Sequence, residues 1–100
     1  MNKYQLVLQF PESIGFEKMV ELENLMMAAV QDKAIVDGHD IGSGEINIFI
    51  HTNNPEDSFK VINSLLDKKM RGILKAAYRE ITGRKYVILW PKALTKFKVK

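Results

Sequence analysis

A two-residue period of isoleucines in the middle of the chain points to a fold built on a β-sheet. Within residues 34–52, Ile46, Ile48 and Ile50 alternate with polar or aromatic residues. Successive side chains of a strand point to opposite faces, so this pattern indicates a strand with one buried face. The preceding Gly42-Ser43-Gly44 supplies the backbone freedom for a tight reversal. We therefore expect a β-hairpin over residues 34–52.

The rest of the chain supplies three more strand patterns and two helix patterns. Alternation or β-prone composition predicts strands over residues 3–10, 73–82 and 86–90. Apolar residues at helical spacing predict helices over residues 14–33 and 55–71. These elements follow the order β-α-β-β-α-β, with a further strand at the end.

Single residues indicate where these elements begin, end or bend. Ser13 and Asn54 are expected N-caps of the two helices, and Gly72 is expected just after the second helix. Gly38 interrupts the first hairpin strand, which suggests a bulge or a close backbone approach. Glu23 falls inside the apolar arc of the first helix, and we expect it to reach solvent or to pair with a neighbouring cation.

The element order predicts an α+β fold of the ferredoxin-like split βαβ type, with an extra C-terminal strand. Its antiparallel sheet carries both helices on one face. We expect one ferredoxin-like domain over residues 1–91 and a basic tail over residues 92–100, which either adds a short strand or is disordered. The other sheet face is expected to be uncovered. Its lining residues are Gln5, Val7, Gln9, Glu45, Asn47, Phe49 and His51.

Composition excludes several classes of protein. The sequence has no cysteine, so it forms no disulfide, thiolate metal site or iron–sulfur cluster. The N-terminal stretch is too short and too alternating for a signal peptide, and no apolar run approaches the length of a membrane span. We expect a soluble, cytoplasmic protein without a cofactor or membrane partner.

Charge is distributed unevenly along the chain. Residues 1–50 carry a net charge of −5 and residues 51–100 a net charge of +8. A basic C-terminal part suggests an anionic partner, or the acidic surface of a second copy. Nucleic acid would bind weakly through exposed basic residues, among them Lys68, Arg71, Arg79 and Arg84. The uncovered sheet face offers one aromatic residue, Phe49, beside Asn47, which is a poor platform for stacking RNA bases.

Titratable residues that suit acid–base or metal chemistry gather on the predicted hairpin. Imidazole and carboxylate groups bind transition metals or act as base and orienter. The group consists of Asp37, His39, Asp40, Glu45 and His51. No metal-binding or phosphate-binding motif such as HExxH or GxGxxG accompanies it. His39, Glu45 and His51 are the catalytic or metal-binding candidates of this alternative, and we do not favour an enzyme.

The hairpin sequence also carries a resemblance. DGHDIGSGEINIFIHTNNP, followed by a helix and the later Leu89-Trp90-Pro91, resembles a pattern in small bacterial proteins to which no activity is attached. The resemblance implies the same fold and a bacterial source, and it assigns no catalytic residue. The absence of catalytic motifs, the broad apolar arc of the first helix and the split charge favour a non-catalytic protein-binding or dimerisation module. Its partner would be a second copy or another protein, and Asn47 and Phe49 would contribute to binding.

Overall fold

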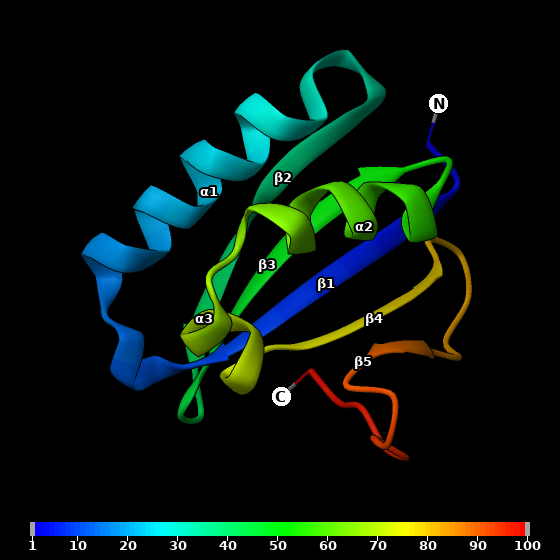
Figure 1. Ribbon diagram of the computed structural model, residues 1–100. Coiled ribbons are helices and arrows are strands. Elements are labelled where there is room, and N and C mark those ends of the chain that lie inside the picture. Colours follow the sequence, from blue (N-terminus) through cyan, green and yellow to red (C-terminus); the bar gives the residue numbers. More distant parts are fainter. Residues whose placement is uncertain (1, 100) are drawn as a thin grey trace.

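The computed structural model describes residues 2–99, which form a five-stranded antiparallel sheet with helices on one face (Figure 1). The strands are β1 (Tyr4–Pro11), β2 (Ala34–Gly42), β3 (Glu45–Thr52), β4 (Lys75–Glu80) and β5 (Val87–Trp90). The helices are α1 (Phe16–Val30), α2 (Pro55–Leu65) and α3 (Lys68–Ile73), with short 3-10 turns η1 (Glu12–Ile14) and η2 (Gln31–Lys33). The predicted α+β class is confirmed.

The sheet has the strand order β2-β3-β1-β4-β5, so β1 is central and β2 and β5 form the edges. On β1, Val7 lies opposite Phe49 of β3 and Ala77 of β4, and this register sets the two faces of the sheet. The alternate residues of β1 and β3 face the helices. Those buried residues are Leu6, Leu8, Phe10, Ile46, Ile48 and Ile50.

The helices close the core from the same side of the sheet (Figure 1). Met19, Leu22 and Met26 of α1 and Phe59 and Ile62 of α2 are buried against the inward strand residues. Burying such apolar side chains contributes about 1.5–3 kcal/mol each to folding. The two-residue and helical periods therefore describe the core correctly.

The hairpin prediction is confirmed, including its turn and its bulge. Ser43 and Gly44 connect β2 and β3 with φ angles of 54° and 80°, values that favour glycine and small polar residues. In β2 the pairing register shifts between Val36 and Gly38, and Gly38 has a φ of 150°. Asp37 is the extra residue of this bulge.

Two predicted helix boundaries are wrong. Ser13 lies in the 3-10 turn before α1, and Gly15, with a φ of 88°, is the N-cap of α1. The predicted helix over 55–71 is two helices, because Leu66 adopts an extended backbone and Asp67 starts α3, and Gly72, expected just after the helix, lies inside α3. The Asp67 carboxylate accepts a hydrogen bond of 2.8 Å from the Met70 amide, and such a cap favours a new helix start.

The sheet face away from the helices is not open along its whole length. Gln9 and Asn47 point to this face, yet they are only 4% and 1% exposed. Residues 92–99 have no regular structure, but Gln9 Nε2 donates to the Lys98 carbonyl at 2.8 Å. The Phe97 ring packs on Tyr86 with 5.0 Å between centroids. The expectation of an uncovered face is therefore wrong around Gln9 and Asn47. Met1 and Lys100 lie outside the described residues.

Candidate functional site

The titratable residues of the hairpin are divided between the two faces of the sheet. In a regular strand, Asp37 and His39 would share one face. The bulge places Asp37 as an extra residue, so His39 pairs with Ile48 on the face that carries the helices. His51 points to the opposite face, where it pairs with Gln5 of β1. The predicted cluster does not converge, and residues 2–99 contain no group of three His, Asp or Glu side chains able to hold a metal ion.

His39 is bound to helix α1. Its Nδ1 lies 3.0 Å from Glu23 Oε1, and the Glu23 side chain is 13% exposed. The Phe16 ring meets the imidazole edge-on at 6.3 Å between centroids. Glu23 thus has a neighbouring imidazole as its partner, and this contact attaches α1 to the edge strand β2.

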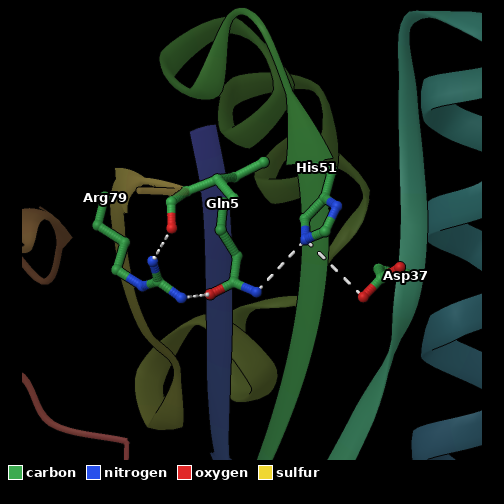
Figure 2. Close-up of polar contacts among 5 residues, drawn as sticks. Gln5, Asp37, His51 and Arg79 are labelled. Carbon is green, nitrogen blue, oxygen red and sulfur yellow. Dashed lines mark hydrogen bonds and ion pairs between the residues drawn. The ribbon is translucent and has the colours of Figure 1, made fainter. Parts of the chain in front are cut away.

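His51 belongs to a row of polar side chains that crosses four neighbouring strands (Figure 2). Arg79 Nη2 donates to Gln5 Oε1 at 2.9 Å, and Gln5 Nε2 lies 3.4 Å from His51 Nε2. On the other side, His51 Nε2 is 3.8 Å from Asp37 Oδ2. Arg79 fixes the amide of Gln5 so that its NH₂ group faces His51, whose Nε2 then accepts the hydrogen bond. A neutral His51 in this row carries its proton on Nδ1.

Glu45 lies apart from both histidines, at the end of the sheet where the hairpin turn meets the C-terminal segment. It lines a cleft of about 600 Å³ together with Gln9, Pro11, Lys75 and Phe97. Glu45 also pairs with Pro11 across β1 and β3. The three candidate residues of the enzyme alternative, His39, Glu45 and His51, are therefore found at three separate places.

Two of the predicted nucleic-acid-binding residues hold the fold together. Arg79 Nη1 donates to the carbonyls of Glu80, Ile81 and Gly83 at 3.1, 2.8 and 3.2 Å, which caps the turn after β4. Arg71 Nε donates to the Asn63 carbonyl near the end of α2 at 2.9 Å. Their guanidinium groups satisfy main-chain acceptors.

The other predicted binding residues differ in their accessibility. Lys68 and Arg84 are exposed, whereas Phe49 is half-buried. Asn47 is buried and its Oδ1 accepts a hydrogen bond of 2.9 Å from Gln9 Nε2. Asn47 thus faces its own chain and not solvent.

An apolar surface that the sequence patterns did not single out lies along the free edge of β2. We call it the edge surface, and it consists of Phe16 and Met27 of α1 and Ile35 and Ile41 of β2. These side chains are 60%, 48%, 58% and 37% exposed, respectively. Phe16 and Met27 lie on the α1 face that contacts His39, because they are three turns apart in the helix. The helical period predicts the wide apolar arc of α1, but it does not predict which strand lies beside that arc.

Comparisons with protein families, with curated proteins and with solved structures find no match to this chain. Within residues 2–99, no helix combines the length and the apolar composition that crossing a bilayer requires.

Proposed function

We propose that the protein is a binding module that takes up an extended basic segment of another protein along the free edge of β2. The observation that carries this proposal is a nine-residue edge strand flanked by exposed apolar side chains. The outer side of an edge strand has unpaired amides and carbonyls, which a partner strand can bind. The exposed apolar residues on either side supply contacts for its side chains.

The geometry of β2 restricts how such a partner binds. Ile41 lies on the helix side of the edge, because it pairs with the buried Ile46, and Ile35 lies on the other side, where it pairs with His51. The bulge at Asp37 interrupts the regular ladder, so the partner would pair along His39–Gly42. Bulges and charges on edge strands also protect them from indiscriminate pairing. The surface thus favours a short, specific contact.

Charge selects the kind of partner. Residues 16–42, which include α1 and β2, carry six acidic residues and two lysines. Asp37 and Asp40 are exposed on the edge strand itself, and Lys18 is already paired with Glu21 at 3.2 Å. Two such surfaces facing each other would repel, so a basic segment is the favoured occupant. The other edge strand, β5, has only four residues and follows Arg84 and Lys85.

We also propose that the fold is a ferredoxin-like split βαβ sandwich. The neighbouring positions of β1 and β3 and the order β2-β3-β1-β4 support this plan. The chain adds α3 and the edge strand β5 to it.

The binding proposal is tested by titrating the labelled protein with a synthetic peptide of alternating lysine and valine and following the backbone amides by NMR. We expect the largest shifts along His39–Gly42 of β2. Ile41→Lys adds a like charge and removes an apolar contact, so it should weaken binding about tenfold, equivalent to about 1.4 kcal/mol. Val87→Lys on β5 is the matched control, because Val87 is 49% exposed on the other edge. It should leave the affinity unchanged.

Two results would contradict the proposal. One is equal binding of a peptide that alternates glutamate and valine, and the other is a set of shifts confined to β5 or absent at millimolar peptide. Light scattering of the free protein tests whether the occupant is a second copy. A stable dimer whose interface protects the β2 amides would show that it is.

A further inference from the structure

The cleft beside Glu45 is built from parts of the chain that lie far apart in the sequence. Its floor and walls come from the end of β1, the hairpin turn, the start of β4 and the C-terminal segment. The lining residues are Gln9, Phe10, Pro11, Ser43, Gly44, Glu45, Ile73, Lys75, Lys96, Phe97 and Lys98. A volume of about 600 Å³ lies within the range of small-molecule sites.

The cleft has an excess of positive charge. Lys75, Lys96 and Lys98 line it, while Glu45 is its one acidic residue. Within residues 2–99, these lysines form no ion pair with a carboxylate within 4 Å. Three lysines that line one cavity repel each other, and a multiply charged anion bound among them would relieve that repulsion.

The C-terminal segment that supplies two of these lysines is fastened at three points. Gln9, which is 4% exposed, donates to the Lys98 carbonyl, and Phe97 packs on Tyr86. The Leu94 amide donates to the Pro91 carbonyl at 3.0 Å, which closes a turn after β5. Lys96 and Lys98 therefore stand beside Lys75 without the cost of ordering a free tail.

We propose that this cleft binds a small phosphate-bearing molecule. Lysine ammonium groups act as compact point charges for phosphate, and Phe97 and Ile73 offer apolar walls to the organic part of the ligand. The phosphate would lie on the side of the cleft that carries the lysines, away from the negative charge of Glu45. The Glu45 carboxylate would accept hydrogen bonds from hydroxyl or amino groups of the ligand. This inference does not depend on the edge surface, which lies on α1 and β2.

The test is an NMR titration of the labelled full-length protein with inorganic pyrophosphate. We expect saturable shifts of the amides around Gly44, Lys75 and Phe97. Lys75→Gln should weaken binding about fivefold, as for the loss of one charge pair at a protein surface. Glu45→Gln should strengthen it, because the variant removes the one negative charge of the cleft. Lys60→Gln, on the exposed side of α2, is the matched control and should have no effect.

Three outcomes would overturn the proposal. The first is the absence of saturable shifts at millimolar pyrophosphate, and the second is an equal response of Lys75→Gln and Lys60→Gln. The third is a short single-stranded oligonucleotide that binds far more tightly than pyrophosphate and shifts Lys68 and Arg84 as well. That result would identify a polyanion surface and not a small-molecule site. Unchanged thermal unfolding of each variant confirms that the fold is intact.

Discussion

At the scale of single residues, the basic part of the chain contains arginines that are committed to its own backbone. Arg79 reaches three carbonyls and Gln5, and Arg71 reaches the end of α2. Charge counted along the sequence cannot separate these residues from Lys68 and Arg84, which are exposed. The guanidinium group has five donors in a rigid fork, and this geometry suits it to several acceptors at once.

The replacement of Arg79 by lysine tests this structural role. Arg79→Lys keeps the positive charge, but its ammonium cannot reach the three carbonyls and Gln5 together. We expect the free energy of unfolding to fall by about 1–2 kcal/mol. Arg84→Lys, at an exposed position, should change it by less than about 0.5 kcal/mol. Urea denaturation followed by the fluorescence of Trp90 measures both, and equal effects of the two variants would contradict the role assigned to Arg79.

At the scale of elements, β2 departs most from the simple period of its sequence. Asp37 and Gly38 occupy the position of one residue opposite Phe49, so the two halves of the strand are out of step. This shift sends Ile35 to one side of the edge and Ile41 to the other. It also explains why the predicted cluster of His39 and His51 does not form.

Two glycines of β2 provide a matched pair for testing the bulge. At both Gly38 and Gly42 an added Cβ would meet no atom within 4 Å. Only Gly38 has a φ in the region that side chains rarely adopt, at 150°. Gly38→Ala should therefore lower the free energy of unfolding by about 1–3 kcal/mol, and Gly42→Ala should leave it nearly unchanged. The same urea denaturation measures the unfolding free energy of both variants. If Gly38→Ala were as stable as Gly42→Ala, the bulge would accommodate a side chain without strain, and the prediction would be wrong.

At the scale of the whole molecule, strand and helix periods were sufficient to predict five strands, the hairpin and the buried face. They failed at one local helix cap and at a place where packing between distant segments determines the structure. The break at Leu66 depends on the local capping of Met70 by Asp67, which competes with an uninterrupted helical pattern. The position of Phe97 on Tyr86 depends on packing between segments, and the alternation of lysines in the tail carries no sign of it.

Tyr78 connects the sheet to helix α2 and makes the stability of the fold depend on alkaline pH. Burial, and next the negative charge of Glu56, raises the pKa of the Tyr78 phenol above its ordinary value. Since the folded state favours the protonated phenol, this stabilisation is complete below about pH 10 and is lost as the pH rises through the folded-state pKa. Tyr78→Phe lacks this ionisation. The unfolding free energy of the wild type should therefore fall relative to that of Tyr78→Phe as the pH rises above about 10, and a constant difference would contradict the raised pKa.

The bulge in β2 also determines where this strand tolerates a change of length. Because Asp37 and Gly38 share one partner, the loss of one of them would restore a regular ladder and leave the other side chains on their present faces. A single deletion elsewhere between Ala34 and Gly42 would turn over the side chains between the gap and the bulge. Sequences that share this fold should therefore vary the length of β2 at positions 37 and 38, and a correct alignment to this chain would place its gap there.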